Sequence, residues 1–93
     1  ISEIFKSLHE FKMKVDLIQN SAISFSVCIY DKYNRIDDLI SKMEGKFDIK
    51  IYRNVCLYTI RYFDENSIKK ISNGKKLLLE QRTEKTIQLI FPY

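Results

Sequence analysis

The fold is decided by residues 15–27, which read VDLIQNSAISFSV. Apolar and polar side chains alternate on each side of Asn20 and Ser21, and this period of two is typical of half-buried β-strands. Asn and Ser are residue types that favour turns. We therefore expect a hairpin with one strand over residues 13–18 and its partner over residues 23–30.

A helical pattern flanks this hairpin on each side. Apolar residues recur at helical spacing ahead of it, which predicts an amphipathic helix over residues 2–12. After the hairpin, Asn34 is placed to cap a second helix, and Gly45 is placed to end it. Alternating apolar residues then predict a further strand over residues 47–51.

The second half of the chain begins with residues 55–63, which are apolar on both faces and predict a central strand. Asp64 is placed to cap a short helix that closes near Gly74. A strand that begins at residues 77–79, a polar bend over 81–85 and a returning strand over 87–91 follow, and Pro92 ends the pairing. This order predicts an α+β fold of the ferredoxin-like class, an antiparallel sheet with helices packed on one face.

The two hairpins resemble each other in sequence. Residues 19–27 read QNSAISFSV and residues 81–89 read QRTEKTIQL. Gln comes first in both, a hydroxyl residue third, and hydroxyl and apolar residues sixth and seventh. Each copy also follows a helix, so a duplicated unit is the interpretation we favour.

The composition of the chain argues against several classes of function. With 16 basic and 12 acidic residues the net charge is only +4, and the lysines are scattered, which indicates a solvated surface more than a nucleic-acid site. Cys28 and Cys56 lie in strand patterns, which predicts two buried reduced thiols and a cytoplasmic location. One histidine and two distant cysteines do not make a metal site, and no cofactor is expected. No membrane-length apolar run or signal peptide is visible, so no membrane partner is expected.

Residues 15–27 resemble the signature of the first ACT domain of aspartate kinases. Residues 79–83, with residues 86–89, look like the matching hairpin of the second ACT domain. The combination is similar to the C-terminal tandem ACT regulatory region of bacterial monofunctional aspartate kinases. The resemblance implies a first ACT unit over residues 1–54 that lacks its opening strand, and a second, abbreviated ACT unit over residues 55–93. Since the chain opens inside a helix without an initiator methionine, we expect it to be part of a longer protein.

The resemblance also implies a function. Aspartate kinases use ATP to phosphorylate the side-chain carboxylate of aspartate, at the entry to lysine, threonine and methionine biosynthesis. Their ACT domains pair across a homodimer through the sheets and bind a feedback amino acid, usually lysine or threonine. The chain is therefore expected to be non-catalytic and to regulate a catalytic kinase domain of the same parent chain.

Five residues match the effector site of the family. Asp16 matches the aspartate that holds the effector's ammonium group, although a salt bridge to a nearby lysine explains it equally well. Lys14 and Val15 match positions that offer backbone groups. Asn20 and Ser21 match positions that reach the ligand across the dimer, and ordinary turn chemistry is the alternative for Asn20.

The chain departs from the family next to this site. Ala22 stands where the family has a glutamate, which removes an anionic partner for a lysine effector. In the second copy, Arg82, Thr83 and Glu84 form either a second effector or interface site or the polar tip of a hairpin, and we favour the tip.

Three other functions compete with amino-acid sensing. A purely structural dimerisation module needs no ligand. An RNA-binding ferredoxin-like domain would draw on the basic charge and the aromatic strands, but the Gly-flanked aromatic signature of RNA-recognition motifs is missing. A small enzyme is disfavoured because no phosphate loop, metal cluster or His–nucleophile pair is visible, and His9 reads as a surface or packing residue.

Overall fold

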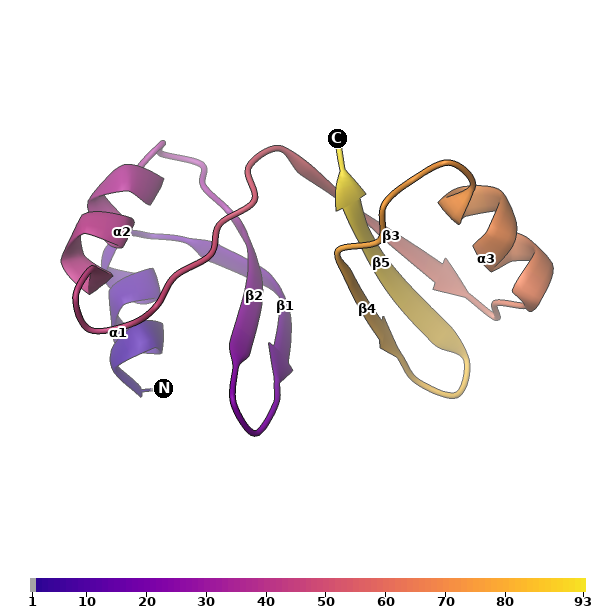
Figure 1. Cartoon of the computed structure of the whole chain (residues 1–93), viewed down its shortest axis with the longest axis horizontal. Helices are drawn as coiled ribbons and strands as arrows, with labels where there is room; N and C mark the ends of the chain where they lie inside the picture. Colours follow the sequence, from indigo (N-terminus) through magenta and orange to yellow (C-terminus); the bar gives the residue numbers. More distant parts are fainter. Residues whose placement is uncertain (1) are drawn as a thin grey trace. The chain divides into compact units, whose positions relative to one another are not determined.

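The computed structural model describes residues 2–93 and divides the chain into two compact units, the first ending at Lys50 and the second spanning Ile51–Tyr93 (Figure 1). The first unit contains α1 (Ser2–Glu10), β1 (Lys14–Asn20), β2 (Phe25–Tyr30) and α2 (Ile36–Met43). The second contains β3 (Val55–Arg61), α3 (Glu65–Ser72), β4 (Leu79–Arg82) and β5 (Thr86–Pro92).

In the first unit, β1 and β2 form an antiparallel hairpin with both helices on one face. The core of this unit is a cluster of buried side chains, Leu8 from α1, Leu39 from α2 and Met13 between α1 and β1. Val27 and Ile29 pack against this cluster from β2. Every second residue of a strand faces the same side, so the packing of both Val27 and Ile29 against the core confirms the apolar–polar alternation seen in the sequence.

The two helices of the first unit lie side by side. Lys42 of α2 pairs with Glu10 of α1, and the Lys46 Nζ lies 2.6 Å from the Glu3 Oε1. These ion pairs are exposed, so each contributes little to stability. They show that α1 and α2 are neighbours in one helix layer.

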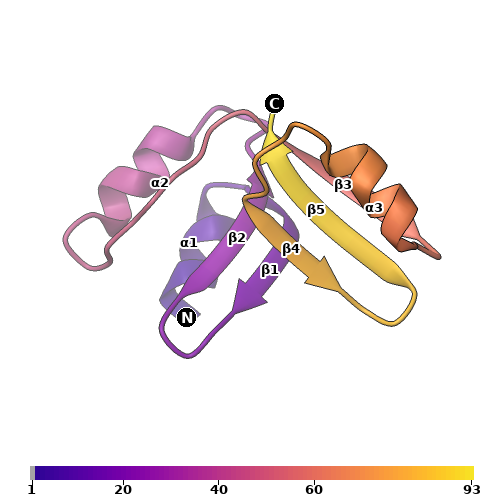
Figure 2. The ribbon, with the colours of Figure 1, turned by 45° about the vertical axis from the view of Figure 1, so that its right-hand side comes forward.

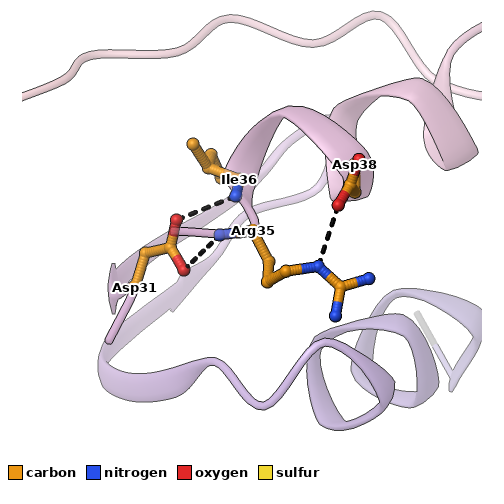
Figure 3. Close-up of polar contacts among 4 residues, drawn as sticks. All are labelled: Asp31, Arg35, Ile36 and Asp38. Carbon is orange, nitrogen blue, oxygen red and sulfur yellow. Dashed lines mark hydrogen bonds and ion pairs between the residues drawn. The ribbon is translucent and has the colours of Figure 1, made fainter. Parts of the chain in front are cut away.

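The start of α2 corrects one prediction. Asn34 does not cap this helix; its backbone is left-handed, with φ of 56°. The cap is Asp31, whose carboxylate accepts the backbone N–H groups of Arg35 and Ile36, each at 2.8 Å (Figure 3). Arg35 Nε also donates to Asp38 Oδ2 at 2.8 Å. Asp31 satisfies N–H groups that the first turn of a helix cannot bond internally.

In the second unit the strand order is β3-β5-β4, all antiparallel (Figures 1 and 2). The prediction that residues 55–63 form the central strand is wrong, because β5 lies between β3 and β4. Ile87, Leu89 and Phe91 of β5 have no exposed surface and form the core of this unit. The local pattern of β3 could not reveal this order, since strand neighbours are set by long-range pairing.

Helix α3 begins as predicted. The Asp64 Oδ1 accepts the Ser67 backbone N–H at 2.7 Å, and the Asp64 N–H donates to the Ser67 Oγ at 3.0 Å. This reciprocal capping box fixes the first turn of α3. The left-handed turn before it falls on Tyr62, with φ of 54°, and the helix closes just ahead of Gly74, with φ of 73°.

No strand forms over residues 47–51, so that prediction is wrong. Phe47 takes part only in an isolated bridge with Glu44, and residues 48–53 lack regular structure. Phe47 and Ile51 remain 37% and 41% exposed. An alternating pattern yields a strand only where a neighbouring strand bonds its backbone, and no such neighbour lies beside this segment within residues 2–93.

The two hairpins share one register. Leu17 pairs with Cys28 in the first hairpin, and Leu79 pairs with Ile90 in the second, at residue numbers 62 higher. The remaining pairs correspond with the same offset. In the first hairpin they are Ile18 with Val27, Gln19 with Ser26 and Asn20 with Phe25. In the second hairpin they are, in the same order, Glu80 with Leu89, Gln81 with Gln88 and Arg82 with Ile87. This agreement supports the duplication read from the sequence.

Candidate effector site

Lys14, Val15 and Asp16 lie together at the beginning of β1. The register of β1 against β2 shifts between Val15 and Leu17, so Asp16 is the extra residue of a β-bulge. Its carboxylate lies 3.7 Å from the Lys14 Nζ, and the Asp16 side chain is only 30% exposed. Bulges locally re-aim a side chain and interrupt strand pairing, and they are frequent next to binding sites.

The Asp16 carboxylate also acts on a thiol across the hairpin. Burial raises the pKa of Cys28, and the negative charge of Asp16 raises it further. Cys28 pairs with Leu17, the residue that follows the bulge. The Asp16 carboxylate is thus close enough to the Cys28 thiol to disfavour its ionisation.

Asn20 and Ser21 lie at the other end of β1. Asn20 is the last residue of the strand, and Ser21 opens the turn. The Ser21 N–H donates to the Ser24 carbonyl at 2.9 Å, and the Ser21 Oγ accepts the Ser24 N–H at 3.1 Å. Ser21 therefore closes the hairpin, as turn chemistry requires.

The two groups of residues are too far apart to hold one small ligand within one chain. A strand rises by about 3.3 Å per residue, so Asp16 and Asn20 are separated by roughly 13 Å along β1. A free amino acid places its ammonium and carboxylate groups on one carbon atom. The structure brings Lys14, Val15 and Asp16 together and separates them from Asn20 and Ser21.

In the second unit, Arg82, Thr83 and Glu84 lie at the end of β4 and in the following turn. The Arg82 Nε donates to the Glu80 Oε2 at 3.1 Å, and its guanidinium lies 5.3 Å from the centre of the Phe63 ring. The Thr83 Oγ1 accepts the Thr86 N–H at 3.2 Å. Glu84 is exposed in this turn.

The bulge is the feature that reading the sequence missed. A regular strand would place Val15 and Leu17 on one face, whereas the bulge puts Leu17 opposite Cys28 and Ile18 opposite Val27. In the sequence, the adjacent apolar residues Leu17 and Ile18 break the strict alternation of the strand, and this break is the signal that could have indicated a bulge.

His9 is exposed on α1. Within residues 2–93, no group of His, Cys, Asp and Glu side chains could hold a metal ion, and no helix is long and apolar enough to cross a membrane.

The antiparallel sheets, covered by α1 and α2 in the first unit and by α3 in the second, define an α+β fold of the ferredoxin-like class. Among solved structures, the chain is similar to the ligand-free crystal structure of the regulatory subunit of aspartate kinase from Thermus thermophilus. The TM-score is 0.64 at 14% sequence identity, and the match covers 98% of this chain and 70% of that one. At this identity the likeness establishes the fold. No protein-family model and no curated protein sequence matches the chain.

Proposed function

We propose that the chain is the regulatory, amino-acid-sensing ACT region of an aspartate kinase. The observation that carries the proposal is the likeness of fold to an aspartate kinase regulatory subunit over 98% of the chain. The sequence signature in residues 15–27 supports it independently. In this proposal the catalytic kinase domain belongs to the same parent protein, and the region itself has no catalytic activity.

The effector binds where Asp16 leaves the regular ladder. The Asp16 carboxylate, at 30% exposure, is available to an incoming ammonium group, and the bulge directs it away from the strand pairing. The outer edge of β1 has no paired strand within residues 2–93, so the backbone near Lys14 and Val15 is free to bond a carboxylate. Ligand binding would replace the weak, exposed contact between Lys14 and Asp16.

The separation along β1 implies that two chains complete the site. Asn20 and Ser21 lie roughly 13 Å or more from Asp16 within one chain, since each residue adds about 3.3 Å. They reach the same ligand only if a second copy supplies them, which is the homodimer that the family resemblance implies. Ala22 offers no charge for a lysine side chain, so an effector with a small neutral side chain, such as threonine, suits the site better than lysine.

Titration calorimetry on the kinase that contains this chain tests the proposal. Threonine, lysine and methionine are added in turn, and at least one is expected to release heat and change the rate of aspartate phosphorylation. Asp16→Asn should weaken binding about ten-fold or more, because a hydrogen bond to a charged group is worth about 1.5–3 kcal/mol. Asp48→Asn, an exposed carboxylate outside the helices and strands, is the matched control.

A structural dimerisation module is the second candidate. The Lys14 ammonium at 3.7 Å already provides Asp16 with a partner, so no ligand is needed to neutralise it. If no amino acid gives heat while the chain still forms dimers by sedimentation, dimerisation without sensing is the function. If the parent protein does not phosphorylate aspartate, the kinase assignment is wrong.

A further inference from the structure

Positive charge is concentrated in the second unit of the chain. The first unit carries eight basic and eight acidic residues, whereas the second carries eight basic and four acidic ones. The whole net charge of +4 therefore belongs to residues 51–93. Lysines that look scattered along the sequence are thus divided unevenly in their charge balance between the two compact units.

Four of these cations lie close together in sequence around the end of α3. Lys69 and Lys70 are in the last turn of the helix, and Lys75 and Lys76 follow the left-handed turn at Gly74. Figure 1 shows the end of α3 and the segment that leads into β4 at one end of the second unit. All four side chains are exposed, and none has an ion-pair partner within residues 2–93. These four residues form the lysine cluster.

No acidic residue interrupts the lysine cluster. The sequence from residue 66 to residue 79 contains none, and neither β3 nor β5 contains one. The start of α3, where two of the acids lie, is about 10 Å from its end, because a helix rises by about 1.5 Å per residue. That separation is about one Debye length at physiological salt, so those acids neutralise the cluster only weakly. The four acidic residues of this unit are Asp64, Glu65, Glu80 and Glu84, and Glu80 is paired with Arg82.

Lys75 is held in place by two aromatic rings. Its Nζ lies 4.8 Å from the centre of the Tyr58 ring and 5.5 Å from the centre of the Phe91 ring. Phe91 has no exposed surface, so these cation–π contacts attach the ammonium group to the core of the unit. The helix dipole favours lysines in the last turn of α3, but it does not account for Lys75 and Lys76, which lie beyond the helix.

We infer that the lysine cluster binds the phosphate backbone of single-stranded nucleic acid. Exposed lysines gain little from single carboxylates, whereas binding to a nucleic acid also releases the counterions condensed on its phosphates. The site lies at one end of the unit and not on the sheet face where RNA-recognition motifs place their aromatic residues. The inference does not depend on amino-acid sensing.

Two other anionic partners fit the cluster less well. A membrane-binding helix needs a free apolar face, but Ile68 and Ile71 of α3 pack against the core of the second unit. A duplex is stiff and touches so small a patch along one backbone only. A flexible single strand can place several successive phosphates against the four lysines, so it uses the whole cluster.

Fluorescence anisotropy on the 93-residue chain tests the inference. The probe is a labelled oligouridylate of about 12 nucleotides, within the range of common single-strand site sizes. We expect a Kd of about 1–100 µM near physiological salt. The logarithm of the binding constant should fall with the logarithm of salt concentration with a slope of about −3, because each phosphate neutralised on a single strand contributes about −0.7.

Paired substitutions locate the site. Lys69→Gln with Lys70→Gln should weaken binding several-fold and reduce the salt slope by about 1.4, since two phosphate contacts are lost. Both side chains are exposed, so the variant should fold, which circular dichroism checks. Lys6→Gln with Lys32→Gln makes the same change of net charge at exposed positions of the first unit and should leave the slope unchanged.

Three results would overturn the inference. The first is no binding of the oligouridylate at about 100 µM chain in low salt. The second is an equal loss of affinity in both double variants, which would mean that net charge alone drives the association. The third is tighter binding to an RNA duplex of the same length, or to vesicles of phosphatidylserine and phosphatidylcholine, than to the single strand. The salt slope of the unaltered chain decides the question if the Lys69 and Lys70 variant does not fold.

Discussion

The Thr83 Oγ1 accepts the backbone N–H of Thr86 at 3.2 Å, and the Thr83 N–H donates back to the Thr86 carbonyl at 2.8 Å. Ser21 and Ser24 make the same two contacts in the first hairpin. One turn design thus closes both hairpins, with a hydroxyl residue at each end of the turn. Between these residues the first turn presents Ala22 and Ile23, and the second presents Glu84 and Lys85.

Removing the hydroxyl should loosen each hairpin separately. We expect Thr83→Val to lower the stability of the second unit by about 1 kcal/mol, because it leaves the Thr86 N–H without its side-chain acceptor. Native-state amide exchange at Leu89 measures this effect. Glu84→Ala, at the exposed tip of the same turn, should change it by less than about 0.5 kcal/mol. Equal effects of the two variants would contradict the turn role of Thr83.

Asp31 should contribute more to α2 than Asn34 does. Asp31→Ala removes the acceptor for two backbone N–H groups and should cost about 1–2 kcal/mol, measured by amide exchange at Leu39. Asn34→Gly should be tolerated, because glycine adopts the left-handed backbone found at this position without strain. A larger loss from Asn34→Gly than from Asp31→Ala would restore Asn34 as the cap.

The capping box of α3 should make the stability of the second unit depend on pH. Hydrogen bonds from the backbone and side chain of Ser67 lower the pKa of Asp64 below its ordinary value of 3.8. A carboxyl group with a lowered folded-state pKa stabilises fully above its unfolded pKa, and this contribution disappears as the pH falls through the folded value. Stability should therefore fall below about pH 4.

Thermal unfolding between about pH 2 and pH 6 measures this effect. Asp64→Ser keeps a capping hydroxyl without a titrating group, so the difference in Tm between wild type and variant should shrink as the pH falls. Glu84→Gln removes an exposed carboxylate elsewhere in the unit and serves as the control. A pH-independent difference would show that the charge of Asp64 contributes nothing.

The alkylation rate of Cys28 should depend on the charge of Asp16, the residue at the bulge. Burial and, to a lesser degree, the Asp16 charge raise the pKa of its thiol, so little reactive thiolate is present near neutral pH. Asp16→Asn should therefore speed alkylation of Cys28 by iodoacetamide, followed by mass spectrometry. Cys56 in the same molecule is the internal control, and its rate should not change. If both rates rise together, the variant has loosened the fold.

Local pattern predicted most of the fold. The hairpins, the three helices and the capping role of Asp64 follow from periodicity and turn chemistry within short windows. Which strand is central could not be read in this way, because β3 and β5 are both apolar and only pairing between distant segments decides their order. The same limit explains why residues 47–51 form no strand. Their sequence alternates, but no neighbouring strand within residues 2–93 bonds their backbone.

The candidate site was predicted in part. Lys14 and Asp16 lie together, as their spacing on one strand suggests, but the bulge that turns Asp16 out of the ladder depends on pairing with β2. The turn positions of Ser21 and Thr83 were predicted from residue type, whereas their bonds to Ser24 and Thr86 were seen only in the structure. Whether Asn20 and Ser21 contact an effector depends on a second chain, and this stays a prediction.

The left-handed backbone at Tyr62 makes this position a target for engineering heat tolerance. A bulky residue with positive φ is held there at an energetic disadvantage, and Tyr62 is 72% exposed. Asparagine accepts this backbone more readily, so the substitution would release strain without touching the core of the second unit or the candidate site. The added stability would allow destabilising variants of Asp16 to be studied in a protein that stays folded.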